Sequence, residues 1–262
     1  MKKNIFNKVG ALNFLKKYES TSTFIIPNFF SISKKDYKSD KKNLLKKIKI
    51  FFNWKKIILR SSSSNEDTKE FSNAGKFKSF GNIDYYNDKK IINSCDEIIK
   101  DFKNNNDRIL IQEFIYKPKI SGVIFSRDIN NNAPYCTINY DSSGKTNLIT
   151  AGKKNPTMKN LVLFKKDIKN YSFFGIRLNI LYVIEKIFKN NRLDIEFCIK
   201  KNIFYLLQCR HLKHLPQIND VEILLSGKVA FDYFSDNKFT GSFLLIDKND
   251  NETLAVGIIT RF

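Results

Sequence analysis

The sequence is poor in cysteine, histidine, proline and glycine. The scarcity of the first two argues against a disulfide-rich or zinc-binding protein. Its 262 residues include 4 Cys, 2 His, 5 Pro and 10 Gly. The cysteines show no C-x-x-C spacing, so we expect buried free thiols rather than disulfides or a zinc site. The two histidines form a lone H-x-x-H without a further ligand at metal spacing, which argues against a histidine-held metal. In chain order these residues are Cys95, Cys136, Cys198, Cys209, His211 and His214.

Long apolar runs are also missing. No stretch approaches the roughly 20 residues that a membrane helix needs. The N-terminus, residues 1–10, carries lysines but no apolar core of signal-peptide length. The sequence therefore predicts a cytoplasmic location and no membrane partner.

Arginine is scarce in a chain that is otherwise strongly basic. The net charge is +20, from 46 Lys and Arg against 26 Asp and Glu, yet only seven of the 46 are arginines. Lysines are spread over the whole length, with no arginine-rich arm. A solvated lysine surface is the favoured interpretation, nucleic-acid binding is disfavoured, and a general preference for anionic ligands stays open.

The pattern of apolar residues predicts a mixture of helices and strands. Hydrophobic residues make up 42% of the chain, including 24 Phe and 11 Tyr, so a folded core is expected. Several predicted strands follow one another closely, which indicates antiparallel pairing and an α+β fold. We expect helices at 6–18, 40–53, 88–104 and 176–189, and strands at 56–59, 108–115, 121–126, 133–140, 193–200 and 202–208.

The chain changes character after Pro216. Apolar runs at 229–233, 240–247 and 253–259 predict strands, and no helical pattern is present. These residues are too few to close a barrel of their own. We therefore expect two parts, residues 1–215 and a β-rich appendage at 216–262.

A guanidinium stands in a polar run directly after the predicted strand at 56–59. The run Arg60-Ser-Ser-Ser-Ser-Asn-Glu-Asp67 offers a planar fork, hydroxyls and backbone N–H groups, which suit phosphate oxygens. A polar loop with a surface arginine is the other interpretation, and the run alone does not decide between them.

A carboxylate and an amide occupy two apolar, strand-like runs twelve residues apart. Burying Glu196 is costly unless it is paired or binds a cation. In a hairpin, Glu196 and Gln208 are near cross-strand neighbours, so both can reach one Mg²⁺, which accepts such ligands together with phosphates and water. Arg210 falls on the same face and can neutralise a phosphate, while Asp194 is expected to fix local geometry. An ordinary edge-hairpin salt bridge is the alternative.

Two further segments add candidate ligands. Gln112 and Glu113 end a predicted buried strand and can place backbone groups and a carboxylate against an adenosine. Arg127 ends the next strand and is a second candidate phosphate cation.

These residues resemble the ATP-binding, ATP-grasp-type domain of the phosphoenolpyruvate synthase and pyruvate phosphate dikinase family. Six short motifs occur in the family's order over residues 5–213, and the stretch 133–152 looks most like the glutamine kinase branch. The motifs are Lys8 with its helix, Leu59-Arg-Ser-Ser with Glu66-Asp67, Ala74-Gly-Lys-Phe77, Ile111-Gln-Glu113, Ser121-Gly-Val-Ile-Phe-Ser-Arg127, and Asp194-Ile-Glu196 with Leu207-Gln-Cys-Arg210.

The resemblance implies specific roles. Lys8, Arg60 and Arg127 would bind the ATP phosphates, and Arg210 would lie beside the metal. Glu196 and Gln208 would hold Mg²⁺. Gln112 and Glu113 would line the adenine and ribose pocket. The implied catalytic residues are Arg60, Arg127 and Arg210.

In that family ATP phosphorylates a histidine on a separate swivelling domain, which passes the phosphoryl group to an acceptor. Nothing after residue 213 resembles that domain, and His211 and His214 lie too close to the ATP motif to replace it. The resemblance therefore implies a histidine domain on another polypeptide and a small acceptor such as glutamine or pyruvate. The rival hypothesis is a non-catalytic ATP-binding or partner-docking module.

A second resemblance concerns the tail. Residues 229–259 look like the last strands of the sulfate adenylyltransferase large subunit, without its GTPase motifs, since the chain has no G-x-x-x-x-G-K-[ST]. This resemblance implies no adenylyltransferase activity. A β appendage on the main domain is favoured over a docking element.

Overall fold

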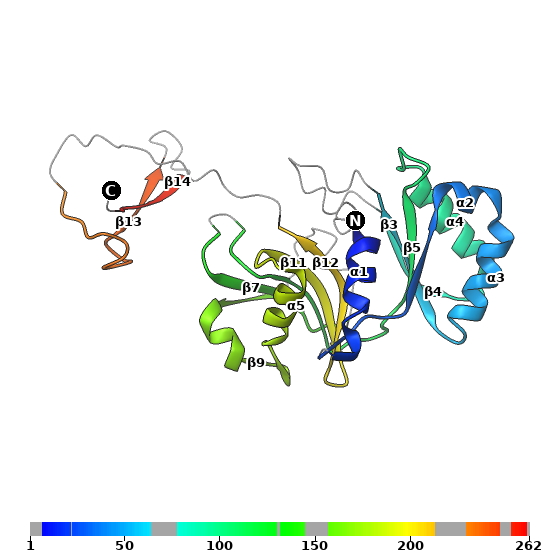
Figure 1. The fold of residues 1–262 in the computed structure, drawn as a ribbon, viewed down its shortest axis with the longest axis horizontal. Coiled ribbons are helices and arrows are strands. Elements are labelled where there is room, and N and C mark those ends of the chain that lie inside the picture. The colour runs from blue at the N-terminus through cyan, green and yellow to red at the C-terminus, as the bar shows by residue number, and fades with distance from the viewer. Residues whose placement is uncertain are drawn as a thin grey trace. The chain divides into compact units, whose positions relative to one another are not determined.

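The computed structural model describes residues 7–21, 23–63, 78–129, 132–144, 157–212, 229–246 and 253–260. Contacts between residues divide the chain into two units, Met1–Ile218 and Asn219–Phe262. The first unit holds two large sheets with helices, and the second holds one hairpin (Figure 1). The mixture of helices and mainly antiparallel strands confirms the predicted α+β class.

The first large sheet has four antiparallel strands in the order β2-β5-β3-β4. Their bounds are β2 Phe29–Ser33, β5 Arg108–Glu113, β3 Lys56–Ser62 and β4 Ser79–Asp84. The central strands β3 and β5 are almost fully buried. Because side chains alternate along a strand, Ile57, Leu59, Ile109 and Ile111 share one face, and all four belong to one apolar core.

Three helices supply most of the rest of that core, and Figure 1 shows them together beside the sheet. They are α2 Lys34–Ser39, α3 Lys41–Phe51 and α4 Asp88–Ile99. Leu44 and Ile48 of α3 are one turn apart and face the sheet, as the period of 3.6 requires. The carboxylate of Asp40 caps α3 by accepting a hydrogen bond from Asn43 N, and Asn87 caps α4 by accepting one from Lys90 N.

The second large sheet has six strands in the order β1-β12-β11-β6-β7-β8. Their bounds are β1 Phe24–Ile25, β12 Ile203–His211, β11 Leu193–Lys200, β6 Ile120–Phe125, β7 Tyr135–Asp141 and β8 Met158–Phe164. Only β1 runs parallel to its neighbour, and the other pairs are antiparallel.

Helices α1 Lys8–Lys16 and α5 Ile180–Phe188 contribute to one core with this sheet. The sheet face that enters this core includes Ile124, Ile195 and Cys209, while Leu12 and Ile184 come from the helices. Short elements complete the unit, namely 3₁₀ turns at Glu19–Thr21 and Lys165–Asn170 and a two-residue hairpin of β9 Ser172–Phe173 and β10 Ile176–Arg177.

Some predicted boundaries were wrong. The helix expected at 88–104 ends at Ile99, because the Asn-rich segment after it forms a turn in which Asp107 accepts a hydrogen bond from Asn104 N. Helix α2 and strand β8 were not predicted. Strand β3 continues through Ser62 instead of ending at Leu59, so the first serines belong to a buried strand and not to a polar loop.

The second unit contains β13 Ser242–Ile246 and β14 Thr253–Ile258, which pair antiparallel. No helix occurs among its described residues, 229–246 and 253–260. The strand expected at 229–233 is wrong, since this stretch is irregular.

The four cysteines are buried free thiols, as predicted. Burial raises the pKa of Cys95, Cys136 and Cys198 to about 12, so these thiols stay protonated at neutral pH. None of the described helices is both long and apolar enough to cross a membrane.

Gly122 gives a direct test of the packing in the six-stranded sheet. A Cβ at this position would lie 2.5 Å from the backbone oxygen of Asn139 and 2.8 Å from the ring of Phe197. Gly122→Ala should therefore lower the free energy of unfolding by about 1–3 kcal/mol through overpacking. Urea denaturation measures this, with the exposed Ser79→Ala as the control; equal effects of the two substitutions would contradict the predicted contact.

Candidate functional site

Arg60 joins the two large sheets. It lies near the end of β3, and its Nη1 donates to Glu196 Oε2 of β11 at 2.9 Å, across 136 residues of sequence. The two side chains are only 9% and 16% exposed. Arg60 is therefore not a surface residue of a polar loop, and the ion pair of Glu196 is made between sheets rather than within its own hairpin.

The position of Arg60 follows from alternation along β3. Leu59 faces the helices, so Arg60 faces the opposite side of the four-stranded sheet. Gln112 of β5 lies opposite Ile58 and so shares this second side with Arg60. Gln112 is 1% exposed, and its Nε2 donates to the backbone oxygen of Leu207 at 3.4 Å. The second side of the sheet thus presents polar side chains to β11 and β12.

Helix α1 contacts the same end of β3. Lys8 Nζ donates to the backbone oxygen of Ser61 at 3.2 Å, and Val9 N donates to Ser62 Oγ at 3.3 Å. Ser61 and Ser62 are at most 2% exposed. The structure therefore brings Lys8 next to Arg60, while Ser64 and the segments 66–67 and 74–77 lie outside the described residues.

Glu196 and Gln208 are direct cross-strand partners in the β11–β12 ladder. The ladder shifts register just after Glu196, which leaves Leu207 as an extra residue on β12. Gln208 is 3% exposed, and its Oε1 is buried without a hydrogen-bond partner within the described part of the chain. Such an unsatisfied oxygen is costly in a folded protein and is suited to a ligand or a cation.

The residues present fit Mg²⁺. A carboxylate and an amide oxygen lie opposite each other, and Mg²⁺ takes one or two such ligands together with phosphates and water. The described residues contain no group of three or more His, Cys, Asp and Glu side chains that could hold a metal by themselves. The remaining ligands would therefore come from phosphate and water.

Asp194 and Arg210 form the next cross-strand pair along the same strands. Arg210 donates from Nε and Nη2 to Asp194 Oδ2, each at 2.6 Å. Asp194 is 5% exposed, whereas the Arg210 side chain keeps 24% exposure. Alternation places both residues on the side of the sheet that carries Glu196 and Gln208.

Arg127 and Glu113 bond to residues other than Arg60, Glu196, Gln208 and Asp194. Arg127 follows β6, donates from Nη1 to Asn132 O at 3.0 Å, and has a buried Nε without a partner among the described residues. Glu113 accepts a salt bridge from Lys55 at 2.8 Å. Consecutive strand residues point to opposite sides, so the side chain of Glu113 does not share the side of Gln112. The predicted roles of both residues remain predictions.

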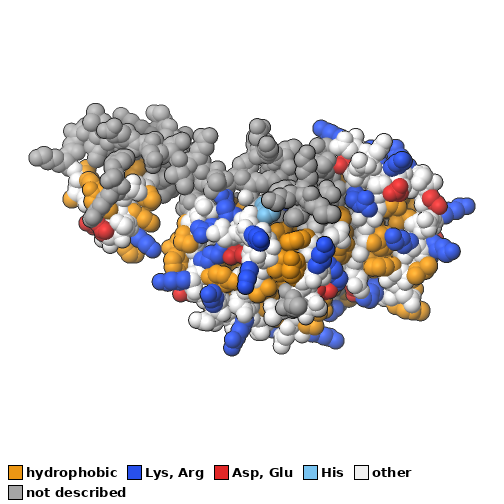
Figure 2. All heavy atoms as spheres, in the orientation of Figure 1, with side chains coloured by type: hydrophobic (Ala, Val, Ile, Leu, Met, Phe, Trp, Pro, Cys, Tyr) orange, Lys and Arg blue, Asp and Glu red, His pale blue; other side chains and the backbone are white. Residues whose placement is uncertain are grey.

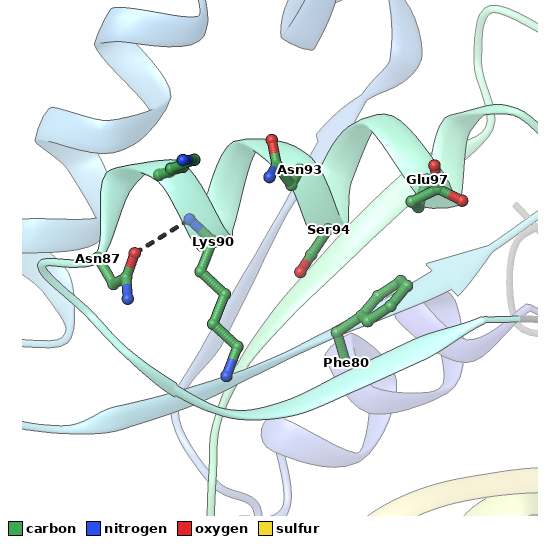
Figure 3. A pocket seen from close by; sticks show the side chains of 7 residues that line it. Phe80, Asn87, Lys90, Asn93, Ser94 and Glu97 are labelled. Atoms are coloured by element: carbon green, nitrogen blue, oxygen red, sulfur yellow. Dashed lines mark hydrogen bonds between the residues drawn. The ribbon is translucent and has the colours of Figure 1, made fainter.

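The described pockets lie elsewhere in the first unit. One, of 350 Å³, lies along α4, where Figure 3 shows Asn87, Ser94 and Glu97 along the helix with Phe80 on the strand below. Glu97 is already bonded to Lys78 and Lys100. The other, of 500 Å³, borders Tyr182 and Glu185 of α5. Neither contains a residue singled out by the sequence.

Arg192 directly precedes β11 and was not considered in the sequence analysis. It precedes Asp194 by two positions and Glu196 by four, so strand alternation places it on their side of the sheet. That spacing was the available signal. Burial, and then the nearby charge of Arg127, lowers the pKa of Arg192.

The chain is similar in arrangement to several solved structures. The D-alanine–D-alanine ligase from Coxiella burnetii matches with a TM-score of 0.46 and 8% identity, over 79% of this chain and 48% of that chain. The same enzyme from Bacillus anthracis, complexed with ATP, gives 0.44 and 12% over 79% and 54%. The RimK domain protein ATP-grasp from Sphaerobacter thermophilus gives 0.43 and 9% over 81% and 61%. The chain thus spans roughly half the length of these structures, and likeness this distant carries no function by itself.

The tail matches different proteins. Residues 207–260 match the family model described as GTP-eEF1A C-terminal domain-like. Sulfate adenylyltransferase subunit 1 from Aeromonas salmonicida is 44% identical over 48 residues, which are 18% of this chain and 10% of that protein. The likeness therefore covers only the C-terminal part of the chain.

A double-mutant cycle tests whether Arg60 and Glu196 hold the sheets together. Arg60→Gln and Glu196→Gln should each lower the free energy of unfolding by roughly 3 kcal/mol, because each leaves a largely buried charge unpaired. Their coupling in the double variant should exceed about 1 kcal/mol. The exposed pair Lys49–Asp88, at 42% and 46% exposure, is the matched control and should couple by no more than about 0.5 kcal/mol. Additive effects at Arg60 and Glu196 would refute the link.

Proposed function

We propose that residues 1–215 form an ATP-grasp-like domain that binds Mg-ATP between the two large sheets. The observation that carries the proposal is the buried, unsatisfied Oε1 of Gln208. This residue lies opposite Glu196, which is paired with Arg60 of the four-stranded sheet. A carboxylate, an amide oxygen and a guanidinium at one point match what a metal-bound polyphosphate requires.

Without ligand, Arg60 and Glu196 are bound to each other as an ion pair. Its two charges neutralise each other in a largely buried position, which lowers the cost of desolvating them. With nucleotide bound, the Arg60 guanidinium would pair with phosphate oxygens and the Glu196 carboxylate would be available to hold the cation. The Nε of Arg60, which has no partner within the described residues, would then gain one.

Bound Mg²⁺ supplies charge neutralisation on the phosphate oxygens. Glu196 and Gln208 would hold the ion, and Lys8, Arg60, Arg127 and Arg210 would orient the phosphates. Gln112, with the backbone of Glu113, would border the adenosine. These roles follow the family's pattern, and the closeness of Lys8, Arg60, Gln112 and Gln208 supports them.

The finer proposal is a phosphotransferase related to phosphoenolpyruvate synthase, with a glutamine kinase-like acceptor choice. ATP would phosphorylate a histidine domain supplied by another polypeptide, and glutamine or pyruvate would receive the phosphoryl group. His211 does not serve as that carrier in the proposal, since its ring packs against Phe188 and its Nδ1 contacts Asn190. His214 lies outside the described residues.

The tail has a separate place in the proposal. Its likeness to sulfate adenylyltransferase subunit 1 supports a β appendage derived from a barrel end, without adenylyltransferase activity. A docking element is the alternative.

Two other functions are the alternatives to this proposal. A non-catalytic ATP-binding module would share the nucleotide site but transfer nothing. Nucleic-acid binding rests on the charge of +20 alone, and Figure 2 shows Lys and Arg side chains distributed over the visible face rather than gathered in one patch.

Ligand-induced stabilisation tests the nucleotide site. Mg-ATP at 100 times its Kd should stabilise the wild type by about 2.7 kcal/mol, which corresponds to a rise in Tm of roughly 5–10 °C. Glu196→Ala and Arg60→Ala should lose this rise relative to their own ligand-free Tm. The exposed Arg177→Ala should keep it and serves as the control. A wild type without any shift would rule out both nucleotide-binding hypotheses.

Product identity tests the transfer step. With the histidine domain of a phosphoenolpyruvate synthase added in trans, ATP should yield AMP and phosphate, and without that domain AMP should not form. Nucleotide chromatography separates AMP from ADP. ADP as the sole product would exclude the histidine route, and no turnover with retained binding would favour the non-catalytic module.

A further inference from the structure

Strand β8 lies at the open edge of the six-stranded sheet. Among the described residues it pairs with β7 alone, over its whole length and without a shift in register. It contains no proline or glycine, and its one charged residue is Lys159. Such an edge is a template for pairing with another strand, so proteins normally shorten it, kink it or place several charges on it.

Two other edges of the first unit are protected in this way. β1, at the opposite edge of the same sheet, is only two residues long. β4, at an edge of the four-stranded sheet, shifts register between Ile57 and Leu59 of β3 and holds Asn82 at a φ of 56°, which indicates a bulge. β8 has neither of these devices.

The hydrogen bond from Lys165 N to Pro134 O, 2.8 Å long, shows which backbone groups of β8 are used by β7. Residues of an antiparallel strand direct their N–H and C=O groups alternately to one side and to the other. The odd-numbered residues of β8 therefore bond to β7. Asn160 and Val162 direct their N–H and C=O groups to the open side.

The open edge also carries exposed apolar side chains. Leu161 and Leu163 pack against the core of the sheet, so Met158 and Val162 lie on the other face. There they are 41% and 54% exposed. Backbone groups directed outward and apolar side chains beside them together suit the addition of a further strand.

We propose that β8 pairs antiparallel with β8 of a second copy of this chain, about a two-fold axis at Leu161. The two six-stranded sheets then form one continuous sheet. Asn160 and Val162 exchange N–H···O bonds with Val162 and Asn160 of the second copy, and Met158 lies opposite Phe164. Closed two-fold dimers of this kind are the commonest homo-oligomers.

The charges select this register among those with two-fold symmetry. With the axis at Leu161, Lys159 lies opposite an apolar residue, and the two copies of Lys159 are four residues apart, roughly 13 Å at about 3.3 Å per residue. An axis at Asn160 would make the two lysines diagonal neighbours. An axis at Val162 would place Lys159 opposite Lys165. Like charges at either spacing are destabilising.

The dimer is expected to be weak and reversible. A single edge of seven residues buries less than the roughly 1,200 Å² at the lower end of standard interfaces. The net charge of +20 on each copy opposes association, so added salt should strengthen the dimer by screening. The inference is independent of the proposed function, because β6 and β7 separate β8 from β11.

Sedimentation velocity of the full chain, over a wide range of concentration and at low and high salt, measures the association. Val162→Lys makes two lysines diagonal neighbours across the axis and should weaken the dimer by about tenfold or more. Ile50→Lys, at a 72% exposed position of α3, adds the same charge elsewhere and should leave the dimer unchanged. Val162→Pro removes an N–H that does not bond to β7, so it should weaken the dimer without unfolding the chain.

Cysteine crosslinking tests the register. The two Leu161 residues would form a non-hydrogen-bonded pair with Cα atoms about 4.5 Å apart, which is within disulfide range. Leu161→Cys should therefore give a covalent dimer when copper phenanthroline is the oxidant, whereas Val162→Cys should not.

A wild type that stays monomeric at every concentration and salt level would overturn the inference. A dimer that Val162→Lys leaves intact, or that crosslinks through Val162→Cys instead of Leu161→Cys, would overturn it as well. Slow hydrogen exchange of the Asn160 and Val162 amides in the monomer would show that the edge is covered within one chain, which also contradicts the proposed pairing.

Discussion

The ion pair between Arg60 and Glu196 is the constraint on which the rest of the first unit depends. Each charge lies at the surface of a different sheet, and neither can remain buried without the other or an equivalent ligand. The pair therefore fixes the distance between sheets whose hydrophobic cores are separate. The hydrogen bonds from Lys8 to Ser61 and from Gln112 to Leu207 also connect the four-stranded sheet to α1 and β12. A site made in this way exists only when both sheets are folded and joined.

The extra residue Leu207 decides which side chains reach that site. The β11–β12 hairpin pairs Phe197 with Leu206, and an unbroken register would place Leu207 opposite Glu196. The bulge instead brings Gln208 opposite Glu196 and turns the following residues to the other side of the sheet. Leu206 and Cys209 thereby both face the core. The carbonyl that the bulge removes from the ladder accepts the bond from Gln112, so one irregularity shapes both walls of the site.

The sequence predicted the hairpin and that Glu196 and Gln208 are near cross-strand neighbours, because apolar runs of strand length and the turn between them are local signals. It did not predict the bulge that makes them direct partners. It also predicted that Glu196 needs a partner, since burial of a carboxylate has a known cost. It did not identify Arg60 as that partner, because a contact across 136 residues leaves no local pattern. Helix α2 was missed since it has only six residues and one buried side chain, Tyr37. The strand at 229–233 was wrong because apolar alternation predicts a strand only where a neighbouring strand is available for pairing.

Local arrangement of charge, rather than the net charge of +20, determines what this protein can bind. Lysines are distributed over the surface, and most of the ion pairs they form are exposed and contribute little to specificity. Along β11, in contrast, the few arginines are matched to carboxylates at fixed positions. Arg60 has Glu196 and Arg210 has Asp194. Guanidinium forks held at fixed positions can bind an anion in a defined orientation, which lysines spread over the surface do not.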